Sequence, residues 1–329
     1  MNGHSRLSRP YLPAALAGLL FFFFGPLSGA RAEAPAVGTQ VPGYYRMMIG
    51  QFELTALCDG SVELDKKLLQ SASDVDIDKL LGGMFVGSPK MQTSVNAYLI
   101  NTGSKLILID SGGGKMLGPS LGNVLPNLRT AGYDPAQVDT VLVTHMHGDH
   151  IGGLLDADGN PAFPNAVVYV SKAESDFWLS AEEAAKAPER AQRTFKVAQT
   201  VSAPYIARKK WEKFEGDAPL FPGIKPVPIP GHTPGHSGYE ISSGDQSLLI
   251  MGDVIHSMAV QFSRPDVAID FDLDPKNAVS GRKDLFQRVA EGKKLVAGMH
   301  LPFPGIGHLR ADANNSYTWV PVQYSPVVH

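Results

Sequence analysis

Histidine and aspartate residues with metal-ligand spacing occur in four short segments of this chain, and each segment follows a β-rich run. The densest is the H-x-H-x-D-H run at 145–150, which comes directly after the largely apolar segment 138–143. Such an apolar run is typical of a buried strand, whose end places side chains along one rim of a fold. Imidazole and carboxylate are ligands that divalent metal ions prefer. The candidate ligands are His145, His147, Asp149, His150, His232, Asp253 and His300.

The spacing within 145–150 indicates two metal ions rather than one. His145 and His147 point the same way in an extended segment, because side chains repeat every second residue. Asp149 and His150 lie at the start of the next predicted helix and face a neighbouring point. Two ions about 3.5–4 Å apart can share a hydroxide and polarise a substrate oxygen together. We therefore predict two divalent ions, expected to be zinc, the first held by His145, His147 and His232, the second by Asp149, His150 and His300, with Asp253 bridging them.

Asp149 and Asp253 are also the candidate catalytic residues of a hydrolase. Asp253 bridges the metals, and Asp149 can take the proton from the attacking water or pass it to the leaving group. Two further residues are predicted to support the ligands: Asp110 by orienting a ligand imidazole or the metal loop, and His236 by donating to a ligand. The alternatives are a turn acid at a strand end for Asp110 and a substrate-pocket wall for His236.

The first 32 residues have the pattern of a signal peptide. Basic residues precede a short apolar stretch, and an A-x-A cleavage site follows at 30–32. An uncleaved membrane anchor is the alternative. Residues 33–43 are predicted to form an N-terminal arm, and residues 44–329 one folded domain. We therefore expect a periplasmic or secreted protein that makes no membrane contact after the leader is cleaved.

Net charge and cysteine content limit the partners and the disulfides that this chain can have. The formal net charge of −3 gives no electrostatic case for nucleic acid, which requires a concentrated basic surface. Cys58 is the only cysteine, so the chain has no internal disulfide, and packing and metal must stabilise the fold. The expected partner is a small-molecule substrate. A homodimer is an alternative that the sequence leaves undecided.

Two β-rich halves with outer helices predict an α/β sandwich in which two sheets lie between helical layers. Residues 171–213 are predicted to be helical, either as a lid or pocket wall or as part of the core. Helices are predicted at 117–131 and 276–291. Strands are predicted at 47–58, 93–101, 105–110, 138–144, 166–170, 224–229, 237–242, 247–251 and 294–299.

The chain resembles the metallo-β-lactamase superfamily. The resemblance rests on the segments 107–112, 145–150, 231–236 and 252–253 and on His300, which occur in the expected order. It implies the four-layer αββα metallo-β-lactamase sandwich for residues 44–329. A closer resemblance, carried by 253–274, 300–308 and 320–325, is to the methyl parathion hydrolase branch and its lactonase and arylesterase relatives. By that similarity His232 is the ligand of its segment.

The closer resemblance implies an exported binuclear hydrolase that cleaves lactones or aryl esters, with side activity on organophosphates. The alternatives are a dedicated phosphotriesterase, a β-lactamase and a non-hydrolytic metal-binding or redox protein on the same scaffold. Phosphotriester-cleaving members have an aromatic pocket, and this chain has Leu117 where a third aromatic is expected. The predicted pocket residues are Leu117, Trp178, Phe195, His256, Ile269 and Phe271. The bulky His256, Ile269 and Phe271 favour a flat ester or lactone over a tetrahedral phosphotriester.

Overall fold

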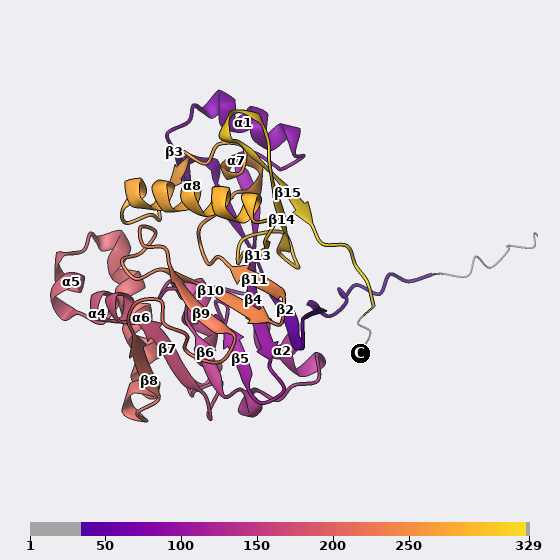
Figure 1. The fold of residues 1–329 in the computed structure, drawn as a ribbon. Coiled ribbons are helices and arrows are strands. Elements are labelled where there is room, and N and C mark those ends of the chain that lie inside the picture. The colour runs from indigo at the N-terminus through magenta and orange to yellow at the C-terminus, as the bar shows by residue number, and fades with distance from the viewer. Residues whose placement is uncertain (1–33, 327–329) are drawn as a thin grey trace, which may run out of the picture. The chain divides into compact units, whose positions relative to one another are not determined.

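The computed structural model describes residues 34–326, so the predicted signal peptide at 1–32 lies outside the described residues. The chain divides into two compact units, Met1–Gln40 and Val41–His329. In the first unit, residues 34–40 contain no helix or strand. The second unit contains the helices and strands that the structure describes, and it begins three residues before the first strand (Figure 1). Among residues 34–326, no helix combines the length and apolar character needed to cross a membrane.

The first sheet has seven strands, antiparallel along its first half and parallel along its second. In spatial order they are β1 (Tyr44–Ile49), β2 (Phe52–Asp65), β4 (Lys90–Asn101), β5 (Leu106–Ile109), β6 (Thr140–Leu142), β7 (Val167–Ser171) and β8 (Trp211–Phe214). The pairs from β1 to β5 are antiparallel, and those from β5 to β8 are parallel. Since β5 and β6 are buried along their whole length, the near-continuous apolar sequence of both is what a parallel interior requires.

The second sheet has six strands, and its centre is the only parallel pair among them. In spatial order they are β15 (Tyr317–Pro321), β14 (Ile306–Ala311), β13 (Leu295–Ala297), β11 (Gln246–Ile250), β10 (Ser237–Ser243) and β9 (Ile224–Pro228). The parallel pair is β11 with β13, and the helix α8 (Pro275–Glu291) makes the crossover between them. The remaining pairs are antiparallel.

Alternation along the strands builds the four layers. In β5, Leu106 and Leu108 point to the core under the outer helices, whereas Ile107 and Ile109 point to the core between the two sheets. The core between the sheets also contains Ile241 of β10, so both sheets contribute to it. The order of layers is therefore helices, sheet, sheet, helix, and the predicted αββα sandwich is confirmed.

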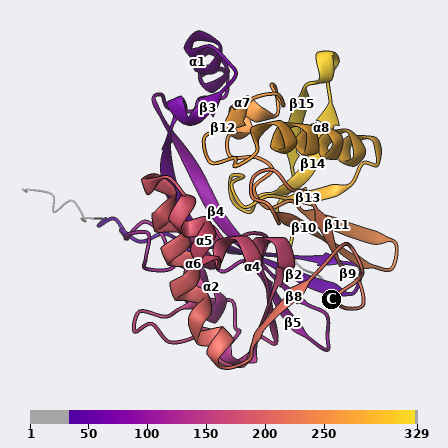
Figure 2. The ribbon, with the colours of Figure 1, turned by 90° about the vertical axis from the view of Figure 1, so that its left-hand side faces the viewer.

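Each outer layer has its own core. Beneath the first sheet lie α2 (Val124–Thr130), α4 (Lys172–Trp178), α5 (Ala181–Lys186) and α6 (Glu189–Ala207). On the second sheet lies α8, whose Leu285, Phe286 and Val289 pack against Leu249 and Val296. Figure 2 shows α4–α6 and α8 on opposite sides of the pair of sheets.

The segment 171–213 belongs mainly to the core and not to a detached lid. Trp178, Phe195 and Tyr205 have at most 3% of their surface exposed and pack in the cluster beneath the first sheet. The helical prediction holds for α4–α6, but the segment ends in the edge strand β8, which pairs with β7.

Two sequence-based boundaries are wrong, and glycine explains both. The predicted strand 47–58 is two strands, and β2 continues to Asp65 through a bulge between Cys58 and Gly60, where Gly60 has φ +145°. The predicted helix 117–131 is reduced to α2, because Gly118 and Gly122 have positive φ and keep the chain irregular until residue 123.

A small subdomain that the sequence did not predict extends from the long β2–β4 pair. It contains α1 (Asp74–Gly83), α7 (Met258–Gln261) and the two-stranded pairing of β3 (Leu69–Gln70) with β12 (Ala268–Ile269). Ile77, Leu81, Val260 and Ile269 are among its buried residues. Figures 1 and 2 both place α1 at the end of the molecule, apart from the helical layers.

Candidate metal centre

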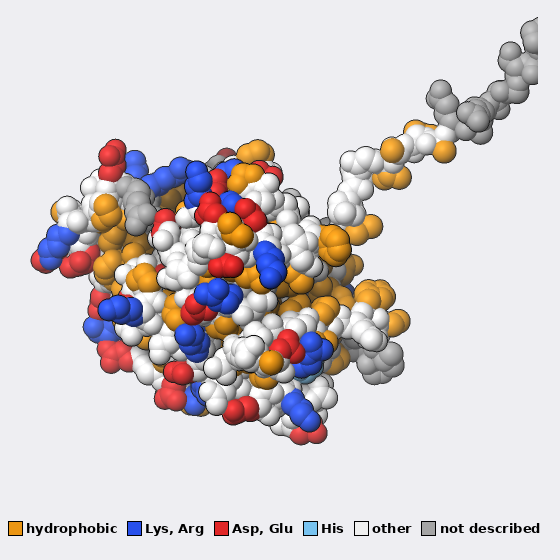
Figure 3. Space-filling model, turned by 90° about the horizontal axis from the view of Figure 1, so that it is seen from above, with side chains coloured by type: hydrophobic (Ala, Val, Ile, Leu, Met, Phe, Trp, Pro, Cys, Tyr) orange, Lys and Arg blue, Asp and Glu red, His pale blue; other side chains and the backbone are white. Residues whose placement is uncertain are grey.

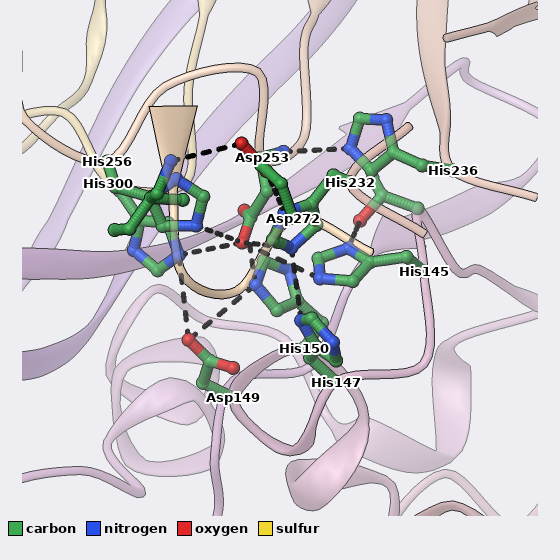
Figure 4. A network of polar contacts seen from close by, with 12 residues as sticks. His145, His147, Asp149, His150, His232, His236, Asp253, His256, Asp272 and His300 are labelled. Atoms are coloured by element: carbon green, nitrogen blue, oxygen red, sulfur yellow. Dashed lines mark hydrogen bonds and ion pairs between the residues drawn. The ribbon is translucent and has the colours of Figure 1, made fainter. Parts of the chain in front are cut away.

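The seven predicted ligands meet at one rim of the sandwich, because each follows or precedes a strand. His145 and His147 follow β6, and Asp149 and His150 lie in the short helix α3 (Gly148–Ile151). His232 lies in the loop between β9 and β10, Asp253 follows β11, and His300 follows β13. Figure 4 shows these side chains converging on the Asp253 carboxylate.

The first group of ligand atoms contains the three histidines predicted for one ion. His145, His147, His232 and Asp253 each offer one atom to a cluster in which all atoms lie within 4.8 Å of one another. His147 Nδ1 lies 3.0 Å from His232 Nε2. His145 Nε2 and His232 Nε2 lie 3.5 and 3.4 Å from Asp253 Oδ2.

The second group contains the three residues predicted for the other ion. Asp149, His150 and His300 offer atoms that also lie within 4.8 Å of one another. Asp149 Oδ2 lies 3.6 Å from His150 Nε2 and 3.5 Å from His300 Nε2. On the Asp253 side, His150 Nε2 lies 3.2 Å from Oδ1 and His300 Nε2 lies 3.0 Å from Oδ2. Asp253 thus lies between the two groups.

These distances fit divalent ions. Two nitrogen ligands of a tetrahedral zinc, each about 2.0–2.1 Å from the metal, lie roughly 3.3 Å apart. The observed ligand contacts of 3.0–3.6 Å scatter around that value. In addition, His145 Nε2, His150 Nε2 and Asp253 Oδ1 are buried without a hydrogen-bond partner among the described residues. Buried polar atoms rarely lack a partner, so these three are best explained as metal ligands.

The second ring nitrogen of four histidines is occupied, which directs Nε2 of each ring at the cluster. His145 Nδ1 lies 3.1 Å from Thr144 Oγ1, and His150 Nδ1 lies 2.8 Å from Asp110 Oδ2. His232 Nδ1 lies 2.9 Å from Asp272 Oδ1, and His300 Nδ1 lies 2.8 Å from the Ser94 carbonyl. Acceptors at these positions fix the Nδ1–H tautomer and leave the Nε2 lone pair for a metal. His147 alone presents Nδ1.

Asp110 and His236 lie one contact away from the ligands. Asp110 follows β5 with φ +57°, and besides His150 it accepts from the backbone N and the hydroxyl of Thr144 at 2.8 and 2.7 Å. It therefore orients a ligand and also fixes the start of the metal loop. His236 Nε2 accepts from Asp253 N at 2.9 Å, and its Nδ1 donates to the Ile229 carbonyl at 3.0 Å. It holds the backbone of Asp253.

The charges of the centre suit a dication. Burial and the neighbouring imidazoles hold the pKa of His145 and His147 well below the usual value. Burial would also lower the pKa of His150, but the carboxylates of Asp253, Asp149 and Asp110 outweigh it and raise that pKa well above normal. For Asp253 the opposite holds: burial would raise its pKa, but the histidines, His150 foremost, lower it well below normal. His150, whose pKa is raised, thus provides positive charge beside the Asp253 carboxylate, where a bound cation would also be stabilised.

The predicted pocket residues lie at different depths. Trp178 packs its ring edge against His147 at 5.5 Å between centroids, and Phe195 packs behind Trp178 at 4.6 Å. Leu117 lies over Gly148, whose ideal Cβ position is 3.4 Å from Leu117 Cδ1. Trp178 therefore borders the first metal group and Phe195 lies behind it, and both are buried in the core.

The other three predicted pocket residues lie across the centre. His256 is in contact with the ligands: Nε2 lies 3.1 Å from Asp253 Oδ2, and its ring stacks on His300 at 4.9 Å between centroids. Burial lowers the pKa of His256 to about 4, although Asp253 opposes that shift. Phe271, 38% exposed, lies 6.0 Å from the His256 ring. Ile269 is fully buried in the subdomain core.

Three buried carboxylates were missed by sequence analysis. Asp272 accepts from His232 and from the backbone N of Ile269 at 3.1 Å. Glu174 contacts the loops that contain His147 and His232 through their backbone N–H groups. Asp59 accepts from Gly113, Gly122 and Val124 N–H groups and thereby fixes the loop that contains Leu117. Each lies far in sequence from the ligand or loop that it supports, so no local motif marks it.

Comparison with known proteins agrees with this centre. The family model described as the metallo-beta-lactamase superfamily matches residues 92–300, which is more than half of the chain. The chain belongs to this superfamily and is a metal-dependent hydrolase. Among solved structures, that of hydrolase AbOPH in the beta lactamase superfamily is 40% identical, with a TM-score of 0.84, and covers 88% of this chain and 100% of that one.

Two further relatives are lactonases. The structure of AidC, a dizinc quorum-quenching lactonase in complex with a product, is 28% identical with a TM-score of 0.79 and covers 86% of this chain and 99% of that chain. An N-acyl homoserine lactonase of Bacillus thuringiensis is 26% identical over 221 residues, which span 60% of this chain and 78% of that protein. Together with the ligand groups, these relatives indicate a binuclear divalent metal site.

Proposed function

We propose that this protein is an exported binuclear metallohydrolase that cleaves lactones or aryl esters, with a weaker side activity on organophosphates. The single observation that supports it most is the place of Asp253. Its carboxylate lies within 3.5 Å of ligand nitrogens from both groups, as a bridging ligand must. The lactone substrate is supported by the similarity to AidC and to the Bacillus lactonase.

The residues of the chain divide the work of such a hydrolase. Two divalent ions at this centre would supply a water of lowered pKa and polarise the substrate carbonyl oxygen. Asp253, 2% exposed, holds both ligand groups together and is shielded from proton exchange with solvent. The side chain of Asp149 is 24% exposed, so it can receive a proton and return it to the leaving group or to solvent.

Substrate shape follows from the side chains around the centre. His256 and Phe271 narrow one side, and Leu117 offers no aromatic face on the other. A planar ester or lactone carbonyl fits a narrow slot better than a phosphotriester, which carries alkoxy arms around a five-coordinate transition state. Discrimination by shape is worth about 10–200-fold, so a phosphotriester activity should still be measurable. We propose the methyl parathion hydrolase branch, with its lactonase and arylesterase relatives, as the closer relationship on the basis of segments 253–274, 300–308 and 320–325.

A small-molecule substrate, with no nucleic-acid partner, also fits the surface. On the face seen in Figure 3, Lys and Arg side chains are interspersed with Asp and Glu, and the formal net charge of the chain is −3. Export through the predicted signal peptide remains part of the proposal, and so does a monomer or homodimer without membrane contact after cleavage.

The test is a substrate panel on the mature protein loaded with zinc. We expect turnover of N-acyl homoserine lactones, aromatic lactones and aryl esters, slower turnover of dialkyl aryl phosphates, and none of β-lactams. Metal-depleted protein and Asp253→Ala, assayed alongside, should be inactive on every substrate that the wild type cleaves. A zinc-loaded protein that hydrolyses only β-lactams, or only phosphotriesters, would overturn the assignment.

A further inference from the structure

We propose that Glu174 is a positioning residue that sets the distance between the two loops carrying His145, His147 and His232. The inference rests on the proposed two-metal function and adds to it a residue that touches neither metal ligand nor substrate. Glu174 lies in the first turn of α4 and is completely buried. A buried carboxylate requires a full set of donors, so its partners show what it does.

Its two oxygens bind two different loops. Oε1 accepts from the backbone N of Met146 at 2.8 Å, and Oε2 accepts from the backbone N of Gly235 at 2.9 Å. Met146 lies between the ligands His145 and His147, and Gly235 lies three residues after the ligand His232. One rigid carboxylate thus fixes the separation of the two segments that supply the whole histidine set of the first group.

A third donor connects Glu174 to the side of His147. Trp178 Nε1 donates to Glu174 Oε1 at 2.7 Å from the next turn of α4. The same indole contacts the His147 ring edge-on at 5.5 Å. The Glu174–Trp178 pair therefore fixes the backbone beside His147 and also the surface against which its ring rests. Trp178 was expected to line the substrate pocket, but it is buried. Its hydrogen bond to Glu174 explains why.

The loop around Gly235 is shaped for this contact. A Cβ at residue 235 would lie 2.2 Å from Glu174 N and 2.7 Å from Glu174 Cβ, so only glycine allows the approach. A backbone bond from Ser237 N to Thr144 O, at 3.0 Å, already joins the two strand ends. Glu174 adds a second link between the two segments, at Met146 and Gly235 beside the ligands.

The experiment compares metal binding by Glu174→Gln with that of a control variant, by chelator competition with zinc and by titration with Co²⁺ monitored through its visible absorption. Glutamine keeps the shape but must turn its amide NH₂ toward one of the two loop N–H groups. Asp59→Asn alters another buried carboxylate, which accepts from Gly113, Gly122 and Val124 and contacts no ligand loop.

We expect Glu174→Gln to bind one ion as tightly as the wild type and the other 10–100-fold more weakly, the usual effect of losing an outer support of a ligand. Asp59→Asn should lower the melting temperature yet keep two ions. Should Glu174→Gln fail to fold, Gly235→Ala, which forces the loop away from Glu174, should produce the same selective loss.

Two results would overturn the inference: wild-type affinity for both ions in Glu174→Gln or Gly235→Ala, or equal metal loss in Asp59→Asn and Glu174→Gln, which would mean general destabilisation. A wild type that binds fewer than two ions would instead contradict the proposed function. The readout is metal affinity, so neither outcome depends on having found the right substrate.

Discussion

Replacing Asp272 with asparagine tests whether the metal centre depends on the tautomer of His232. Asp272 is fully buried at its carboxylate, accepts from His232 Nδ1 through Oδ1 and accepts from Ile269 N through Oδ2. Arg282 lies on the same side as Ile269, with Nη2 3.8 Å from Oδ2. In Asp272→Asn, the side-chain amide oxygen faces the two donors Ile269 N and Arg282 Nη2. The amide NH₂ group therefore faces His232.

An NH₂ group facing Nδ1 reverses the tautomer of His232. Nδ1 then accepts, the proton moves to Nε2, and the lone pair that should face the metal is lost. Loss of an outer support alone costs about 10–100-fold in metal affinity, or roughly 1.4–2.8 kcal/mol. Asp272→Ala removes the acceptor without imposing the wrong tautomer. We therefore expect Asp272→Ala to lose metal affinity near the lower end of that range. Asp272→Asn should lose affinity at or beyond its upper end.

The comparison between the two variants isolates the tautomer, because both remove the negative charge beside Arg282 equally. Zinc affinity is measured by competition with a chromophoric chelator at neutral pH, and circular dichroism verifies that each variant is folded. If Asp272→Asn binds zinc as tightly as Asp272→Ala does, or more tightly, the tautomer argument is refuted. Asp272 would then have only a packing role.

The remaining predictions concern the ions, the ligands, the substrate and the leader. Elemental analysis of the dialysed protein should find close to two divalent ions per chain; one or none would contradict the paired groups. Asp253→Ala and His150→Ala should each abolish most hydrolysis with a native circular dichroism spectrum, and near-normal turnover in excess metal would refute the ligand assignment. Lactones or aryl esters should have a higher kcat/KM than dialkyl aryl phosphates, and the double variant His256→Leu/Phe271→Leu should shift the ratio toward the phosphates; an unchanged ratio would rule out the steric explanation. Mass spectrometry of the exported protein should find an N-terminus near Glu33, whereas an intact leader in a membrane fraction would favour an anchor.

The parts of the fold that sequence predicted are those with a local signal. Strands β5 and β6 were predicted because buried parallel strands are apolar along their whole length. Helix α8 matched within one residue, since its first turn contains Pro275 and is capped by Asp274, both local features. The bulge at Gly60 was missed because an Asp-Gly pair ordinarily indicates a turn, and only the pairing with β4 shows that the strand continues.

The same distinction applies to the site. The ligands were predicted because four of them lie within 145–150 and the others follow apolar runs, so their spacing contains the information. Glu174 and Asp272 act on residues 28 and 40 positions away, and nothing near them in sequence differs from an ordinary surface acid. His256 was predicted as a pocket wall, and the turn that precedes α7 also brings its ring into contact with Asp253, three residues earlier.

The ligands also determine when the centre can form. They extend from His145 to His300, and they follow strands of both sheets, so His300 must be synthesised and β13 paired before the second group exists. An unfolded or half-made chain has no such cluster to fill. Metal therefore enters where the chain folds, and its identity depends on which ions that compartment supplies, because affinity order alone would favour copper over zinc. If the leader directs the chain across a membrane before it folds, the cytoplasm has no part in choosing the metal.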